Sequence, residues 1–209
     1  MKNKLALLVL CGVLMASCGK EYGVQSLSGT QSAIGEVGNT FDMSSVAGLS
    51  NVSAKVTDLS NGVSKIEYMC DITDSKLRSM AEYIPGATFV GDKISAGGQV
   101  KMTDKGIMNV YDEGNLILVK YDAKVGDEYS LKRGSNTVTR TVTAKSTEDD
   151  YFWGWMMIKT IDVEETGRGI PGVSKIEYHT NHKFGLVGVK VHFEDGTSKL
   201  VSIYSTNSD

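Results

Sequence analysis

An alternation of apolar and polar residues with a period of two is the feature that most constrains the fold of this chain. In the segment 64–72, Ile66, Tyr68 and Ile72 share one parity, whereas Lys65 and Glu67 share the other. Such alternation predicts a strand with one buried face and one face in water. Further strands are predicted over residues 99–103, 107–111, 116–121, 128–132, 137–145, 153–163, 174–180, 186–193 and 199–204.

Turn signals separate these predicted strands. The strongest is Asp195-Gly196, because an Asp-Gly pair between two alternating runs is typical of a β-hairpin. Many short strands separated by frequent turns are typical of antiparallel sandwiches and barrels. The sequence therefore predicts a mainly β (β-rich α+β) fold, an antiparallel β-sandwich or a barrel.

One short helix is expected to interrupt the strands. Asp74 is a suitable N-cap for residues 75–84, in which Leu77, Met80 and Ile84 recur at helical spacing. Pro85 follows and would end the helix. We expect this helix to cover an edge or an open end of the sheet.

The N-terminus predicts export. A basic start over residues 1–4 precedes an apolar run over residues 5–14. This run is too short for a membrane-spanning helix, which needs about 20 residues, but it has the length of a signal-peptide core. Residues 1–17 are therefore predicted to be a signal peptide that is removed.

The end of that segment predicts lipid attachment. Ala16 and Ser17, directly before Cys18, resemble the bacterial lipobox, with Met15 at the position where that pattern usually has Leu. The resemblance implies that Cys18 becomes the mature N-terminus and carries the lipid. Several acyl chains on one cysteine would hold the protein firmly in a membrane.

The residues after Cys18 predict where the lipoprotein resides. Gly19 stands where an Asp would resemble an inner-membrane retention signal, and Lys20-Glu21 resembles the charged start of surface-exported lipoproteins. The expected location is therefore the cell envelope, at the outer membrane. Frequent Gly, Ser and Thr predict a flexible tether over residues 18–50, followed by a single β-rich domain over residues 51–209. A short strand or turn near residues 41–43 is the alternative within the tether.

Composition excludes some functions. Lys and Arg total 22 against 25 Asp and Glu, so the formal net charge of −3 argues against a nucleic-acid binder. The sequence contains no nucleophile elbow, metalloprotease motif, phosphate loop or dinucleotide fingerprint. We therefore assign no catalytic residue and no cofactor. Cys70 remains as the single cysteine of the mature chain and is expected to be a buried, inert thiol.

The three histidines do not predict a metal site. His179 and His182 are three residues apart in a predicted strand, so their side chains are expected to point to opposite faces. His192 is expected far from the turn that holds His182. We therefore predict exposed polar histidines and no metal ligands.

A seven-residue identity links two parts of the chain. GVSKIEY at residues 62–68 recurs at residues 172–178. On binary patterning, Ile and Tyr of each copy are expected to face inward, and Lys and Glu to face solvent. The alternative is that the two Lys-x-Glu faces together form a charged site.

Residues 151–158 are the most unusual segment, because both tryptophans of the chain lie there. Tyr151, Trp153 and Trp155 share one strand parity, so a continuous strand would place them in a row. Such a row is a candidate platform for sugar rings or other amphipathic ligands. The alternatives are packing in the core, with Gly154 as a bulge, or an interface with a partner.

Segments 121–129 and 181–188 resemble uncharacterised β-rich lipoproteins of Bacteroidota, and this resemblance implies no known activity. The predicted function is a membrane-anchored, non-enzymatic binding or assembly module of the cell envelope. Its expected partner is a glycan or an envelope protein, with Tyr151, Trp153 and Trp155 as the candidate surface. The alternatives are a barrel that carries a small apolar ligand and a hydrolase without a recognisable motif.

Overall fold

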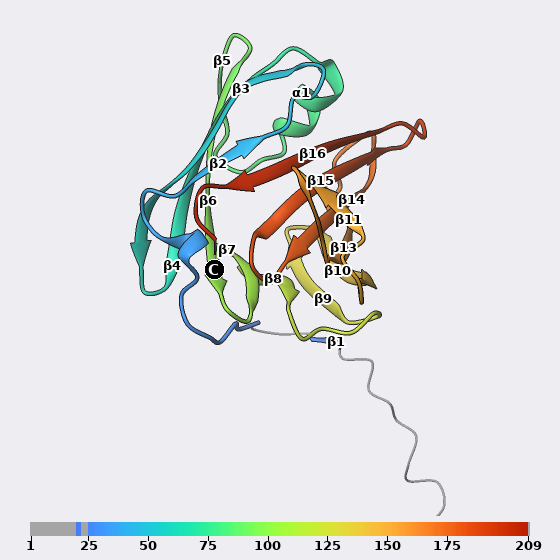
Figure 1. Cartoon of the computed structure of the whole chain (residues 1–209). Coiled ribbons are helices and arrows are strands. Elements are labelled where there is room, and N and C mark those ends of the chain that lie inside the picture. Colours follow the sequence, from blue (N-terminus) through green and yellow to red (C-terminus); the bar gives the residue numbers. More distant parts are fainter. Residues whose placement is uncertain (1–19, 22–24, 209) are drawn as a thin grey trace, which may run out of the picture.

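The computed structural model describes residues 20–21 and 25–208 as a nearly closed, antiparallel, barrel-like β-sheet with one α-helix (Figure 1). The mainly β fold predicted from the alternation is confirmed, and the sheet forms a barrel-like structure. In the described part of the chain, no helix is long and apolar enough to cross a bilayer. The predicted signal peptide and Cys18 lie outside the described residues.

The first half of the chain contains a 3-10 helix, η1 (Ala33–Gly35), the helix α1 (Ser75–Ala81), and the strands β1 (Lys20–Glu21), β2 (Thr40–Met43), β3 (Leu49–Ser60), β4 (Val63–Ile72), β5 (Thr88–Val90), β6 (Lys93–Thr103), β7 (Gly106–Tyr111) and β8 (Gly114–Lys120). The second half contains β9 (Glu128–Arg133), β10 (Asn136–Lys145), β11 (Tyr151–Trp153), β12 (Met156–Ile158), β13 (Ile161–Thr166), β14 (Val173–Asn181), β15 (Gly185–Phe193) and β16 (Ser198–Ser205).

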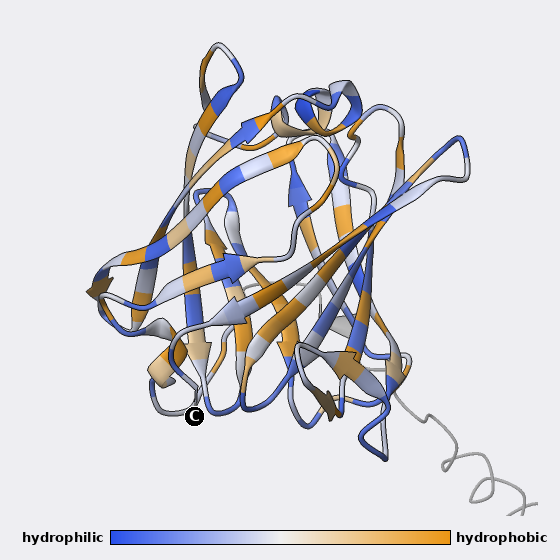
Figure 2. Ribbon diagram, turned by 45° about the horizontal axis from the view of Figure 1, so that its top comes forward, coloured by the Kyte–Doolittle hydropathy of each residue, from blue (hydrophilic) through white to orange (hydrophobic). Residues whose placement is uncertain are grey.

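The large sheet follows the order β1-β9-β10-β13-β14-β15-β16-β2-β3-β4-β6-β7-β8, with β5 paired to β6. β8 lies beside β9, so the sheet curls round and its two ends meet (Figure 1). Alternate residues of the strands point inward, and Figure 2 shows apolar and polar residues alternating along them. Val138, Val142 and Val163, at most 2% exposed, belong to the resulting core.

The predicted helix and hairpin are confirmed. Asp74 caps α1 by accepting a hydrogen bond from the Leu77 backbone N–H at 2.9 Å. The helix ends at Ala81, before the predicted end at residue 84, and packs over a small cluster that contains Ile72 and Ile94. The chain turns at Asp195-Gly196 between β15 and β16, which pair antiparallel as expected.

The prediction of a flexible tether up to residue 50 is wrong for residues 25–50. Leu27 is 4% exposed and Ile34 is 2% exposed, and both belong to the main core. β2 pairs with both β16 and β3, so it joins the two halves of the large sheet. The domain therefore starts well before residue 51. The segment 25–39 shows no alternation because it packs as an irregular chain and a 3-10 turn rather than as a strand.

Polar side chains fasten this N-terminal segment to the sheet. Gln25 bridges the seam of the barrel, because its side chain donates to the Ser130 carbonyl of β9 and accepts from the Ile117 N–H of β8, both at 2.7 Å. Asn39, 1% exposed, bonds to the Ile34 carbonyl at 2.6 Å and to Ser205 of β16 at 2.9 Å. The segment is thus fastened to the barrel at two places, of which the one at Gln25 bridges the seam.

The two copies of GVSKIEY begin the equivalent strands β4 and β14, each paired antiparallel with the strand before it. Ile66 and Ile176 are both 5% exposed, and Tyr68 and Tyr178 pack against the core. Burial raises the pKa of Tyr68 to about 12. The structural interpretation of the repeat is therefore confirmed for its inward face.

The outward faces of the two copies differ. In the first copy, Lys65 pairs with Glu67 of the same strand at 3.0 Å, with both side chains exposed. In the second copy, Lys175 pairs with Glu164 of β13 at 2.6 Å, and Glu177 instead contacts histidines. The charged residues of the two copies therefore do not contact one another. The joint charged site, which was the alternative prediction from the sequence, is not formed.

Candidate functional site

Strands β11 and β12 form a small hairpin outside the large sheet. The chain reverses at Gly154-Trp155, where Gly154 has a φ of +61°. A two-residue hairpin turn with positive φ at its first position favours glycine. The predicted continuous strand over residues 153–163 is therefore wrong, because a turn and a second break divide it into β11, β12 and β13.

The base of this hairpin is fixed to the barrel by Trp153. Trp153 is 7% exposed and its ring lies 4.5 Å from Phe184 and 5.2 Å from Tyr204, measured between ring centroids. Its indole N–H donates to the Ile203 carbonyl of β16 at 2.9 Å. Because a buried indole needs such a partner, this bond sets the position of the hairpin on β15 and β16.

The tip and the outer face of the hairpin are apolar and exposed. We call this surface the aromatic tip; its members are Phe152 (68% exposed), Trp155 (99%), Met156 (48%) and Met157 (47%). An open cleft of about 420 Å³ lies beside it, lined by Trp153, Gly154, Trp155, Met156 and Tyr204. Such a concentration of exposed apolar side chains marks a binding surface more often than a solvated one.

The predicted row of Tyr151, Trp153 and Trp155 does not exist as such. Tyr151 and Trp153 do share the inward face of β11, as their parity predicts, but the turn at Gly154 sends Trp155 into solvent. Trp153 contributes to the cleft at its buried end. That these residues bind a ligand remains a prediction. Of the three, Trp155 is the one most accessible to a ligand.

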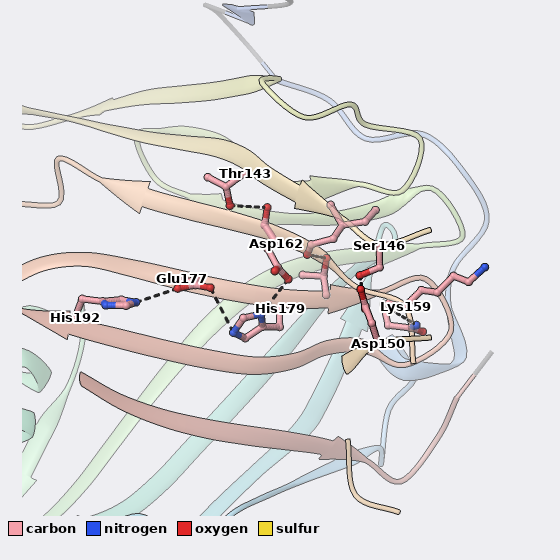
Figure 3. A network of polar contacts seen from close by, with 11 residues as sticks. Thr143, Ser146, Asp150, Lys159, Asp162, Glu177, His179 and His192 are labelled. Carbon is pink, nitrogen blue, oxygen red and sulfur yellow. Dashed lines mark hydrogen bonds and ion pairs between the residues drawn. The ribbon is translucent and has the colours of Figure 1, made fainter. Parts of the chain in front are cut away.

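A polar network lies on the outer face of the barrel beside the hairpin. We call Asp162, Glu177, His179 and His192 the histidine–carboxylate cluster (Figure 3). His179 Nδ1 lies 2.9 Å from Asp162 Oδ1, and His179 Nε2 lies 3.8 Å from Glu177 Oε1. His192 Nε2 lies 2.9 Å from the other oxygen of Glu177. The network thus crosses β13, β14 and β15.

Strand register brings this cluster together. Asp162 is the direct partner of His179 in the β13–β14 pair, and His192 of β15 stands opposite Lys175, two residues before Glu177. The spacing of the histidines does not predict this cluster, because Asp162 lies on another strand and becomes a neighbour of His179 only through the register of β13 and β14. Asp162, Glu177 and His179 all have outward parity in their strands. Once β13 is paired with β14, this parity indicates that the three side chains lie on one face.

The structure corrects one expectation about the histidines. His179 is 7% exposed, so the prediction of an exposed side chain is wrong for it, whereas His182 is exposed. The ring of Tyr151 lies over His179 with centroids 4.9 Å apart. Burial raises the pKa of Tyr151, and the charges of Asp162 and Glu177 raise it further.

The geometry of His179 does not favour hydrolysis. An imidazole with a carboxylate on Nδ1 resembles the base of a hydrolase triad, but such a base holds a nucleophile on Nε2. Here Nε2 faces Glu177. Within the described residues, the hydrogen-bond partner of His179 is Asp162, and no serine, threonine or cysteine side chain bonds to its ring. Cys70 is half-buried on β4, where burial raises the pKa of its thiol.

A second ionic network crosses the interior of the barrel. Arg140 of β10 is 2% exposed and donates to Glu165 Oε2 at 2.7 Å and to Asn109 of β7 at 2.8 Å. Its guanidinium also donates to the Leu116 carbonyl of β8. Arg168 donates to the second oxygen of Glu165 at 2.6 Å. This charged bridge makes the interior a poor match for a carrier of small apolar ligands.

Charge compensation keeps Glu165 ionised. Burial alone would raise the pKa of this carboxyl, but the charge of Arg140 and the hydrogen bond from Arg168 outweigh burial and lower the pKa to about 2. Arg140 and Glu165 are direct partners on the neighbouring strands β10 and β13, Asn109 and Leu116 belong to β7 and β8, and Arg168 lies in the loop between β13 and β14. The network therefore serves the fold rather than a surface site.

Comparison with protein-family models, curated proteins and solved structures gives no match for this chain. Three features of the structure bear on function: the aromatic tip, the histidine–carboxylate cluster and the internal ionic bridge. Of these, the internal bridge is buried and the histidine–carboxylate cluster is half-covered by the hairpin. The aromatic tip is the one with apolar side chains freely open to a ligand.

Proposed function

We propose that the protein is a lipid-anchored, non-enzymatic binding module of the bacterial cell envelope and that the aromatic tip binds a neutral glycan. The observation that carries this proposal is Trp155, which is 99% exposed at the end of a hairpin fixed by Trp153. Exposure of a large apolar ring to water is unfavourable in free energy, and a cluster of exposed apolar side chains is typical of a binding surface.

The shape of the cleft supports stacking of sugar rings. Trp153, Trp155 and Tyr204 bring aromatic rings to its walls. An aromatic ring presents a flat apolar face, and Tyr also carries a hydroxyl that bonds to polar groups. The volume of about 420 Å³ lies in the range of small-ligand sites. Because a hydrogen bond to the backbone already holds Trp153 in place, its side chain loses little conformational entropy when a ligand binds.

The charge near the hairpin favours an uncharged ligand. Glu148, Asp149 and Asp150 directly precede β11 and are all exposed. Their carboxylates repel polyanions and anionic membrane surfaces, and they accept hydrogen bonds from sugar hydroxyls. A neutral polysaccharide therefore fits this surface better than an acidic one.

Replacing Trp155 with alanine is expected to weaken retention on insoluble neutral polysaccharides such as starch, cellulose or mannan. An aromatic residue at the centre of a binding site contributes about 2 kcal/mol, which corresponds to a loss of affinity of about thirtyfold. The matched control is Val90→Ala, which shortens an exposed apolar residue of β5. Equal retention of both variants, or preference for polygalacturonate over the neutral polymers, would contradict the proposal.

The anchor is tested at Cys18. Replacing Cys18 with serine is expected to move the protein from the membrane fraction to the soluble fraction, because the lipid supplies the membrane affinity. Fractionation followed by immunodetection measures this. Cys70→Ser is the control and should leave the protein in the membrane fraction, since that thiol is half-buried in the domain. A Cys18→Ser protein that stays with membranes would refute the lipid anchor.

A further inference from the structure

We propose that Asp162, Glu177 and His179 bind a divalent transition-metal ion such as Zn²⁺. One ligand atom from each of these residues lies within 4.8 Å of the others. One imidazole and two carboxylates form a mixed nitrogen and oxygen ligand set, which suits zinc and its first-row neighbours. The site is separate from the aromatic tip and does not depend on glycan binding.

The gap between His179 and Glu177 is the strongest argument. Asp162 Oδ1 lies 2.9 Å from His179 Nδ1, and an ionised carboxylate only accepts, so in the neutral ring Nδ1 carries the proton. Nε2 then presents a lone pair 3.8 Å from Glu177 Oε1, which is also an acceptor. In this tautomer two acceptor atoms face each other across the gap, and a metal ion between them would be bound by both.

The size of this gap fits a metal ion. Zinc binds nitrogen and oxygen ligands at about 2.0–2.2 Å, so two ligands of one ion lie at most about 4.4 Å apart. The separation of 3.8 Å between His179 Nε2 and Glu177 Oε1 falls inside this limit. It is too long for a hydrogen bond between the two atoms.

The local charge also favours a cation. The side chains of Asp162 and Glu177 are only 22% and 25% exposed. Among the described residues, their ion-pair partners are histidines, and no lysine or arginine nitrogen comes within 4.0 Å of either carboxylate. Lys175 is instead paired with Glu164. Lys190 stands opposite Glu177 in the β14–β15 pair, but it does not form an ion pair with this carboxylate. Two half-buried carboxylates side by side are costly, and a divalent ion bound between them would neutralise them.

Neighbouring side chains hold the candidate ligands in place. The hydrogen bond of 2.9 Å from His192 Nε2 fixes the carboxylate of Glu177, and Oδ1 of Asp162 fixes the ring of His179, so that the second oxygen of Asp162 is the one left for the ion. Tyr151 covers one face of that ring. Metal sites are commonly built in this way, with carboxylates and histidines orienting one another. His192 is thus a positioning residue.

The repeat supplies a matched pair of variants to test the site. Glu177 and Glu67 occupy the same position of the GVSKIEY sequence, but Glu67 is exposed and paired with Lys65. Calorimetric titration of the purified protein with zinc chloride should show one site in the wild type. Glu177→Gln is expected to lower its affinity about tenfold or more, and Glu67→Gln to leave it unchanged.

A second readout separates binding from loss of structure. Zinc should raise the thermal midpoint of the wild type and of His182→Gln, whose histidine is exposed, but not that of His179→Gln. Circular dichroism confirms that each variant is folded. Absence of zinc binding by the folded wild type, or equal binding by Glu177→Gln and Glu67→Gln, would overturn the proposal and leave the cluster as a hydrogen-bonded network.

Discussion

Replacing Arg140 with methionine is expected to lower the free energy of unfolding by about 3 kcal/mol, the lower end of the cost of breaking a buried ion pair, because Glu165 loses one of its two guanidinium partners and keeps only Arg168. Arg140 is 2% exposed and Glu165 is 1% exposed, so water does not replace the lost guanidinium. Asn109 and the Leu116 carbonyl lose a donor as well. Urea denaturation followed by circular dichroism measures the effect.

Two comparisons show whether the buried charge is the cause. Lys65→Met removes a cation from the exposed pair with Glu67 and is expected to cost less than about 1 kcal/mol. The double variant Arg140→Met and Glu165→Met also removes the buried carboxylate. It leaves Arg168 without Glu165, but the Arg168 side chain is 23% exposed and can be solvated, so the double variant should be more stable than Arg140→Met alone. A double variant that is less stable than the single one would contradict this explanation.

The pH dependence of stability reports on the same network. The pKa of Glu165 is lowered from 4.5 to about 2, so its contribution to stability is complete above pH 4.5 and is lost as the pH falls towards 2. The wild type should therefore lose stability across this range more steeply than Glu165→Gln, which does not titrate. Parallel pH profiles for the two proteins would count against an ionised Glu165 in the folded state.

Removing the segment before β3 is expected to prevent folding. A chain that starts at residue 44 lacks Leu27 and Ile34 from the core and lacks β2, which connects β16 to β3. Loss of each buried aliphatic side chain costs about 2–5 kcal/mol, and the total stability of a domain is only about 5–15 kcal/mol. The loss of β2 also exposes two sheet edges.

The control is a chain that starts at Lys20, which keeps Gln25 and its bonds across the seam between β8 and β9. This chain should unfold cooperatively and give the dispersed NMR spectrum of an ordered β protein. The chain from residue 44 should lack both properties. If it folds with the stability of the longer chain, residues 25–43 are not an integral part of the barrel.

The sequence predicted those parts of the fold that depend on local chemistry. Alternation identified most strands, and Asp74 and Asp195-Gly196 identified a helix start and a hairpin, because capping and tight turns act over a few residues. The N-terminal segment escaped prediction. Leu27 and Ile34 are buried by contacts with strands far along the chain, and the irregular backbone around them has no periodic pattern.

The candidate sites were only partly predictable for the same reason. The two tryptophans identify residues 151–158 as a candidate binding segment. The turn at Gly154, however, leaves Trp153 buried and Trp155 exposed, which the sequence does not predict. Asp162 and His179 are 17 residues apart, and only the register of β13 and β14 makes them neighbours. Such non-local pairing follows from the sheet as a whole and not from the sequence near either residue.

The most direct test of the proposed function uses tryptophan emission, because Trp155 is both the expected ligand contact and the exposed fluorophore. Titration with soluble neutral oligosaccharides from starch, cellulose or mannan should quench and blue-shift the emission of the wild type in a saturable manner. The Trp155→Ala variant keeps Trp153 in the wall of the cleft and should respond only at about thirtyfold higher ligand concentrations, with a smaller change in emission. An unchanged wild-type spectrum, or a response of Trp155→Ala at the same ligand concentrations as the wild type, would contradict glycan binding at the aromatic tip.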